Sequence, residues 1–340
     1  MSLEMLLPVL WCGVIGFGVL MYVLLDGFVL GLGILAPFAE DGAQLDHMMN
    51  TAAPIWDGNE TWLVLGGAGL LAAFPPAYAL LLSSLYLPVL MMLIALIFRG
   101  VAFEFRFKAT GGRAFWGAAF SIGSIVVAFS QGLILGALVE GLPRGDTGAG
   151  FASAFAWFSP FAMMTGVALV FGYALLGAGW LVLKTEGPLQ QLARTLTRPL
   201  VLVVVAFMGL VSAWLPFLES RVMARWFDDG HFWWLAPVPL LALVNAVLLW
   251  RAAKAHGRDA RPFVLTLTFF ALGFAGLVLG MWPNIIPPDM SIWDAASPAS
   301  SQIFLGVGIL ILLPAILGYT WWSYSVFRGK VEADSGYHSH

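Results

Sequence analysis

The sequence predicts an all-α integral membrane protein with about nine transmembrane helices, and three observations lead to this prediction. Of the 340 residues, 60% are hydrophobic and only 10% are charged, whereas an average soluble domain carries roughly 25% charged residues. The apolar residues gather into runs of about 20 or more, the length that crosses a bilayer as a helix. The connections between these runs are too short to fold on their own. Lipid is therefore the expected solvent for most of the chain.

Nine apolar runs mark the expected spans, and Pro, Gly or charged residues mark their ends. The first run is preceded by Glu4 and by no Lys or Arg, so it is expected to be retained as a helix rather than removed as a signal peptide. Residues 1–330 are expected to form a single transmembrane domain, followed by a cytoplasmic tail at 331–340. The spans are expected near 8–37, 53–74, 77–98, 114–139, 154–183, 199–217, 232–250, 262–282 and 303–327.

The basic residues predict the orientation, because Lys and Arg concentrate in cytoplasmic loops. With nine spans, all but three of the 16 Lys and Arg residues fall on the side that holds the 3–4, 5–6 and 7–8 loops and the tail. The other side receives only Arg144, Arg221 and Arg225. The N-terminus is therefore expected outside and the C-terminus in the cytoplasm.

Three acidic residues lie inside predicted spans, where a carboxylate costs about 2.5–3.5 kcal/mol on insertion scales and so needs a reason to be there. Asp26 lies in the first span, and Asp57 and Glu60 lie in the second. Asp57 and Glu60 are three residues apart, so they share one helix face. All three are candidates for a proton route. In the alternative interpretation, Asp57 and Glu60 sit in the headgroup region, where acidic residues favour a helix N-terminus.

Arg99 is expected to end the third span on the cytoplasmic side. There, it and Arg106 would be ordinary basic anchors, and Glu104 between them would form ion pairs of little energy if they are exposed.

Ligands for a metal or a haem are scarce in the sequence. Cys12 is the only cysteine, which excludes an intrachain disulfide, a Cys-based zinc site and a Cys-ligated iron–sulfur cluster. All five histidines fall outside the predicted spans, so this chain is expected to bind no haem itself. No basic patch is large enough to predict nucleic-acid binding.

In the segments around Asp26, Asp57, Glu60 and Arg99, the sequence resembles subunit II of the cytochrome bd quinol oxidase family, which includes the cyanide-insensitive oxidases. The most specific match is the tryptophan–aspartate block at 53–62. Further blocks match at 26–33, 67–75, 98–106, 292–297 and 319–331, so the resemblance covers nearly the whole chain.

The resemblance implies both an arrangement and a role. In that family, subunit II has nine helices, arranged as two four-helix bundles and a peripheral helix, and it pairs with a subunit I that carries haem b, haem d and the quinol site. The complex lies in the bacterial inner membrane, oxidises quinol, reduces oxygen to water and generates a proton-motive force without pumping. The expected partners are the haem-bearing subunit, quinol and lipid, with a small single-helix subunit as a further candidate.

The resemblance also suggests roles for single residues. Asp57 matches an aspartate proposed for a proton route at the subunit interface, and Trp56 is its neighbour. Trp62 and Arg99 match positions near a proposed oxygen-access route. Some relatives hold a structural quinone in this subunit, to which no residues are assigned here.

One position departs from the family pattern. Relatives often carry a second first-helix aspartate where this chain has Val29. Its polar role is therefore absent here or is met by Glu60.

Two other functions stay open at this point. Membrane carboxylates and helices interrupted by Gly or Pro also occur in proton-coupled transporters, although no inverted repeat is evident and the polar residues cluster in the first two spans. The closer alternative is a structural subunit, whose carboxylates only dock the partner or secure haem assembly.

Overall fold

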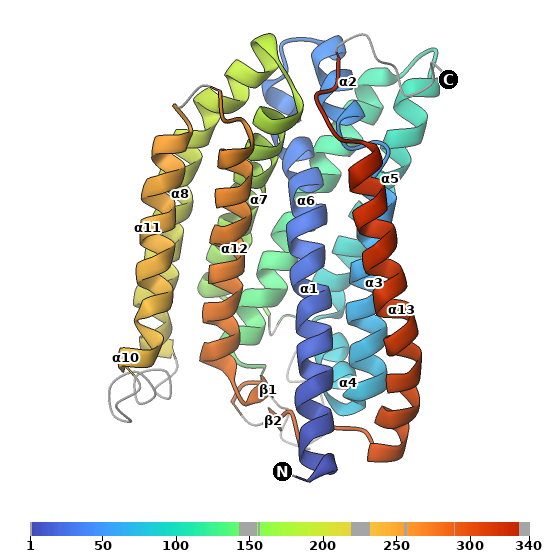
Figure 1. Ribbon diagram of the computed structural model, residues 1–340, viewed down its shortest axis with the longest axis vertical. Helices are drawn as coiled ribbons and strands as arrows, with labels where there is room; N and C mark the ends of the chain where they lie inside the picture. The colour runs from blue at the N-terminus through green and yellow to red at the C-terminus, as the bar shows by residue number, and fades with distance from the viewer. Residues whose placement is uncertain are drawn as a thin grey trace.

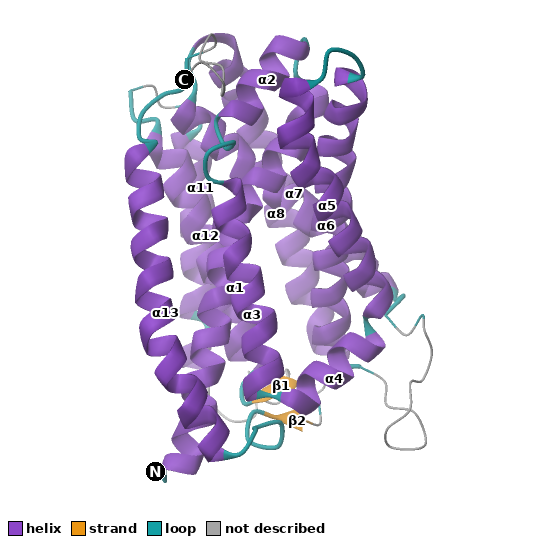
Figure 2. Ribbon diagram, turned by 90° about the vertical axis from the view of Figure 1, so that its right-hand side faces the viewer, coloured by secondary structure: helices purple, strands orange, loops and turns teal. Residues whose placement is uncertain are grey.

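The computed structural model describes residues 2–142, 155, 157–218, 232–254, 257–288 and 290–332. Its long helices run side by side along the longest axis of the molecule (Figure 1). α1 begins at one end and the last helix, α13, finishes at the other. We call the first end the hairpin end, because a short β-hairpin lies there, and the other the α2 end (Figure 2). The all-α prediction is confirmed, with this two-stranded hairpin as an addition.

The long helices pack as two groups that meet along α1, α6 and α7. The first group contains α1 (Leu3–Leu35), α3 (Trp56–Ala73), α5 (Tyr86–Lys108) and α6 (Arg113–Glu140). The second group contains α7 (Pro160–Lys184), α8 (Gly187–Leu218), α11 (Pro237–Ala252) and α12 (Ala260–Met281). α13 (Ala299–Val326) packs on the outside, against α1 and α3. The short elements are η1 (Ala36–Phe38), α2 (Gly42–Asn50), α4 (Pro75–Ser84), α10 (Phe232–Leu235), β1 (Asn284–Ile286) and β2 (Met290–Ser291).

Seven helices in the described part of the chain are long and apolar enough to cross a membrane. The bent pair of α3 and α4 is an eighth candidate, and α11 is a shorter apolar helix of 16 residues. The total of nine spans therefore stays a prediction.

The third predicted span, near 77–98, differs from the structure. α3 ends at Ala73, and Pro75 begins α4, whose axis is bent by 120° from that of α3. Proline has no amide hydrogen and has its φ fixed, so it cannot continue α3 but fits the first position of a new helix. The membrane helix that follows is α5, which continues to Lys108. Arg99 therefore lies inside α5, and the prediction that it ends a membrane span was wrong.

The α2 end carries the basic residues that predict a cytoplasmic face. α5, α7 and α11 each have Lys or Arg in the last turn, and all three finish at this end (Figure 1). The arginines expected on the opposite face lie outside the described residues, so the orientation stays a prediction. His47 lies in α2, and the other four histidines lie outside the described residues.

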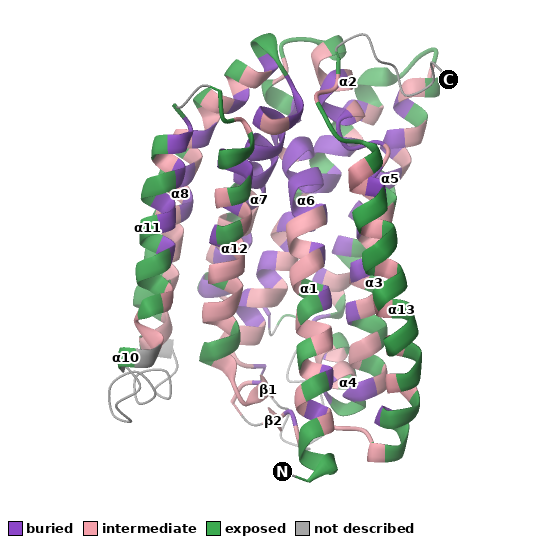
Figure 3. Cartoon of the chain, in the orientation of Figure 1, coloured by how far each residue is buried: buried purple, intermediate pink, exposed green. Residues whose placement is uncertain are grey.

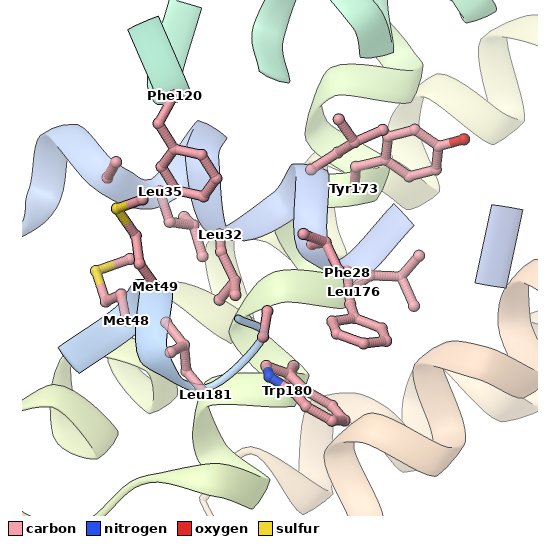
Figure 4. Close-up of a cluster of buried hydrophobic side chains, with 14 of the residues drawn as sticks. Phe28, Leu32, Leu35, Met48, Met49, Phe120, Tyr173, Leu176, Trp180 and Leu181 are labelled. Carbon is pink, nitrogen blue, oxygen red and sulfur yellow. The ribbon is translucent and has the colours of Figure 1, made fainter. Parts of the chain in front are cut away.

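The centre of the apolar core lies where α1, α6 and α7 meet beside α2 (Figure 4). Phe28 stacks on Trp180 with ring centroids 4.0 Å apart. A Cβ atom at Gly31 would lie 2.0 Å from the carbonyl oxygen of Tyr173 and 2.7 Å from the amide nitrogen of Gly177. α1 and α7 therefore touch backbone to backbone, as small residues allow in membrane helices. This contact joins the two groups of helices.

α13 is largely exposed, in contrast to α1 and α7 (Figure 3). Its described side chains are buried only at Gln302 and Ser323. Its far end is held by Lys184 of α7, whose ammonium group donates hydrogen bonds to the carbonyl oxygens of Phe327 (2.5 Å) and Gly329 (2.9 Å).

The segment after α13 is also bound at the α2 end. The Val331 amide donates to the Lys184 carbonyl oxygen at 2.8 Å, and the Val331 carbonyl oxygen lies 2.8 Å from Nε2 of His47. Lys330 donates to Asp259, which precedes α12, at 2.5 Å. We call this set, residues 327–331 with His47, Lys184 and Asp259, the C-terminal clamp. It ties α13 to elements with which the helix itself makes little contact.

Candidate functional site

An ion-pair cluster lies inside the first group of helices, with Arg99 of α5 at its centre. Arg99 Nη2 lies 2.7 Å and 2.9 Å from the two carboxylate oxygens of Asp26 on α1. The same nitrogen lies 3.0 Å from Oε1 of Glu60 on α3. The side chains of Arg99 and Asp26 are fully buried, whereas that of Glu60 is 30% exposed. One arginine therefore holds carboxylates from two other helices, and we call these three residues the Arg99 cluster.

The charges of the Arg99 cluster do not balance. When all three groups are ionised, two carboxylates face one guanidinium group, so the cluster carries one net negative charge. An unpaired charge inside a membrane protein is costly, because no water is present to solvate it. Uptake of one proton by either carboxylate neutralises the cluster. Glu60, whose side chain is partly exposed, is the member that can exchange that proton with the outside of the chain.

Asp57 lies outside the Arg99 cluster, although it is only three residues from Glu60. Its side chain is exposed on the outward face of α3, together with Thr61 and Val64. The structure therefore brings two of the three predicted carboxylates together through Arg99 and places the third on the surface of the chain.

The predicted tryptophans have different surroundings. Trp56 stacks on Phe103 with ring centroids 5.2 Å apart, and the guanidinium carbon of Arg99 lies 5.7 Å from its ring centre, within reach of a cation–π attraction. Trp62 is fully buried and meets Phe17 edge to face at 5.7 Å. Its indole nitrogen has no hydrogen-bond partner among the described residues. Trp56 thus covers the Arg99 cluster, while Trp62 packs against α1.

Asn59 links the site to α1 and α13, a connection that sequence reasoning missed. Its amide nitrogen donates to the Leu25 carbonyl oxygen at 2.9 Å, next to Asp26. Its amide oxygen accepts from the Tyr324 hydroxyl at 3.0 Å. The residue type was a signal, since an amide inside an apolar span needs partners. The partners themselves were not visible in the sequence.

Val29, the departure from the family pattern, is fully buried in the apolar core. The second carboxylate that pairs with Arg99 comes from Glu60 on α3. Within the ranges that the structure describes, no group of three or more His, Cys, Asp and Glu side chains is placed to hold a metal ion.

The fold and the site define a class of protein, a polytopic helical membrane protein with an ion-pair cluster between its helices. A family model described as cytochrome bd terminal oxidase subunit II matches residues 7–327. The chain belongs to this family, and it is therefore a component of a terminal quinol oxidase complex of the bacterial inner membrane.

Curated relatives match over nearly the full length of both chains. A probable cytochrome oxidase subunit 2 from Haemophilus influenzae is 29% identical, over 91% of each chain. The cytochrome bd ubiquinol oxidase subunit 2 of Bacillus subtilis is 28% identical, over 91% of this chain and 92% of the relative. The cytochrome bd-I ubiquinol oxidase subunit 2 of Escherichia coli is 28% identical, over 96% and 95%.

The fold has a counterpart among solved structures. A chain of the bd oxidase from Geobacillus thermodenitrificans superposes with a TM-score of 0.79, over 94% of this chain and 98% of that one, at 17% sequence identity. This likeness shows that the two chains share a fold over nearly their full lengths.

Proposed function

We propose that this chain is the haem-free subunit II of a cytochrome bd-type oxidase and that it lines a route for protons. The partner, subunit I, holds haem b and haem d, at which quinol oxidation and the four-electron reduction of oxygen to water take place. The complex generates a proton-motive force because protons for that reduction come from the cytoplasm. The observation that carries the proposal is the Arg99 cluster, two carboxylates and one guanidinium group inside the membrane.

The exposed Asp57 supports a partner on the outward face of α3. A carboxylate on a membrane helix is costly against lipid, whereas a partner subunit can supply a hydrogen-bond donor. Subunit I therefore covers this face, and Asp57 lies at the interface between the subunits.

The three carboxylates support a route in steps. Asp57 and Glu60 lie on adjacent turns of one face of α3, and Glu60 shares Arg99 with Asp26. A proton that arrives at Asp26 or Glu60 neutralises the Arg99 cluster, and Asp57 receives it at the interface. Trp56 and Trp62 are the candidates for an apolar oxygen path beside Arg99.

The same proposal includes the orientation and the remaining partners. The α2 end faces the cytoplasm, with the N-terminus outside. The structural quinone and the small single-helix subunit that occur in the family are expected without assigned residues, and no nucleic acid is expected to bind.

The test is the substitution Asp57→Asn in the intact oxidase, with quinol oxidation measured per haem. Loss of a positioned proton carrier is expected to slow turnover by roughly a hundredfold, with the haem content unchanged. Thr61→Val is the matched control, because Thr61 lies one turn further along the same exposed face. If haem content falls instead and each assembled complex turns over normally, the carboxylate serves docking or assembly.

A further inference from the structure

A second set of polar side chains, separate from the Arg99 cluster, lies in the interior between α1, α6 and α7. The Tyr173 hydroxyl of α7 donates to Oε1 of Gln131 on α6 at 2.6 Å. Nε2 of Gln131 then donates to the Tyr22 hydroxyl oxygen of α1 at 2.8 Å. Tyr22 and Tyr173 are 4% and 0% exposed. Three helices from both groups therefore contribute one side chain each to a continuous line of hydrogen bonds.

The direction of these bonds points at Asp26. Because the Tyr22 oxygen accepts from the amide, its own hydrogen is free to donate elsewhere. Asp26 lies four residues further along α1, on the same face, so the Tyr22 hydroxyl group is placed to donate to its carboxylate. Asp26 thus has Arg99 as its ion-pair partner and Tyr22 one helical turn before it on α1.

The chemistry of Gln131 limits what this line can do. An amide NH₂ group donates hydrogen bonds but holds no proton that it can pass on and replace. The line therefore fixes orientation and does not conduct. Two buried tyrosine hydroxyl groups would need hydrogen-bond partners in any membrane core. Tyrosines that served only to satisfy each other's hydrogen bonds would not need to lie beside an ionisable group such as Asp26.

We propose that Tyr22, Gln131 and Tyr173 are positioning residues, which hold the Asp26 carboxylate in place against Arg99. This inference rests on the proposed proton route. It identifies the side chains that hold Asp26, the buried carboxylate of that route, in position. The other charged or titratable groups that face Asp26 are Arg99 of α5, Glu60 of α3 and Tyr324 of α13.

The test is infrared difference spectroscopy of the intact oxidase, which reports the surroundings of Asp26 directly. The Asp26 band is identified as the carboxyl absorption that disappears in Asp26→Asn. Tyr22→Phe removes a single oxygen atom and is expected to shift this band and to lower turnover per haem by roughly tenfold. Gln131→Leu is expected to shift the band less, and Tyr173→Phe least, since each is one bond further from the carboxylate.

Ser130→Ala is the matched control, because Ser130 is a buried neighbour on α6 whose hydroxyl has no hydrogen-bond partner among the described residues. It is expected to leave the band in its wild-type position. A band that stays in place in both Tyr22→Phe and Gln131→Leu overturns the inference, whatever happens to assembly or turnover.

The same measurements separate this inference from the proton route. A band that shifts in Tyr22→Phe, together with normal turnover per haem in Asp26→Asn, upholds the positioning role and removes Asp26 from the route. A band that does not shift, together with slow turnover in Asp26→Asn, keeps the route and overturns the positioning role.

Discussion

The Arg99 cluster and the C-terminal clamp use the same chemistry in different surroundings. In the clamp, the Asp259 carboxylate accepts from Lys330 and Arg194, each at 2.5 Å, and it is 27% exposed. In the Arg99 cluster, one guanidinium group holds two carboxylates, and both it and Asp26 are fully buried. Two cations thus meet the single carboxylate of Asp259, whereas in the Arg99 cluster one cation meets two carboxylates.

The difference shows what solvent does to an ion pair. At the α2 end, water replaces a lost partner, so each pair contributes little to the free energy of unfolding. Between the helices, no water replaces a lost partner. The free-energy cost of leaving the remaining charge buried and unpaired then exceeds the energy of the ion pair that was lost. The ion pairs of the clamp are therefore expected to hold the C-terminal segment in place at a small gain in stability. The ion pairs of the Arg99 cluster are expected to be required for the protein to work.

The largest effect is expected from Arg99→Leu, which leaves Asp26 and Glu60 without their cation. Removal of one partner from a buried ion pair costs about 3–5 kcal/mol. We expect a lower melting temperature of the complex and loss of haem, measured by thermal unfolding and absorption. Arg99→Lys keeps the charge and is expected to retain more of both. Wild-type stability in Arg99→Leu would show that the two carboxylates are already protonated.

A smaller loss of stability is expected from Gly31→Ala at the contact between α1 and α7, a substitution that changes no charge. The added methyl group meets backbone atoms of Tyr173 and Gly177, and overpacking of this kind costs about 1–3 kcal/mol. The same thermal unfolding assay applies. Gly13→Ala on the same helix is the control, since nothing lies within 4 Å of its added methyl group. Equal effects of the two variants would contradict a close approach of α1 and α7.

The smallest effect is expected from Asp259→Asn in the clamp, about 0–1 kcal/mol, and it should shrink further as salt is added. The readout is hydrogen exchange at the Val331 amide, which donates to Lys184. Exchange is expected to speed up in the variant. Lys254→Met, at the same end of the molecule, is a control that is expected to leave it unchanged.

The pH dependence of the clamp follows from the same residue. The hydrogen bond from Lys330 holds the pKa of Asp259 below its usual value. A lowered pKa in the folded state stabilises the fold above the unfolded value of about 3.9, and this contribution is lost as the pH falls through the folded pKa. Wild-type Val331 exchange should therefore approach that of Asp259→Asn only in acid. A difference between the two proteins that does not shrink as the pH is lowered would contradict this assignment.

Hydropathy predicted the all-α membrane fold, because lipid demands long apolar runs. The sequence did not reveal the bend at Pro75, since a proline between two apolar runs also fits a plain loop. That one error displaced α5 and made Arg99 look like an anchor at a helix end. The partners of Arg99 come from residues 39 and 73 positions away, and no periodicity along one helix encodes such pairings.

The line through Gln131 escaped prediction for a related reason. Tyrosine and glutamine are uncharged, so they barely disturb a hydropathy profile, and their partners lie on other helices. Gln131 was the available signal, since it is the only amide side chain in the run at 114–139. α2 was also missed, although Asp41 caps it by accepting from the Gln44 amide at 2.8 Å.

The C-terminal clamp has a consequence for the order in which the chain is built. A ribosome releases residues 327–331 after every helix that these residues bind, and domains form from the N-terminus onward during synthesis. α13 buries little of its own surface, so it has few contacts to hold it until Val331 reaches Lys184. Docking of this helix is thus a late event in biogenesis. Until it docks, the amide oxygen of Asn59 on α3 lacks the hydrogen bond from the Tyr324 hydroxyl group.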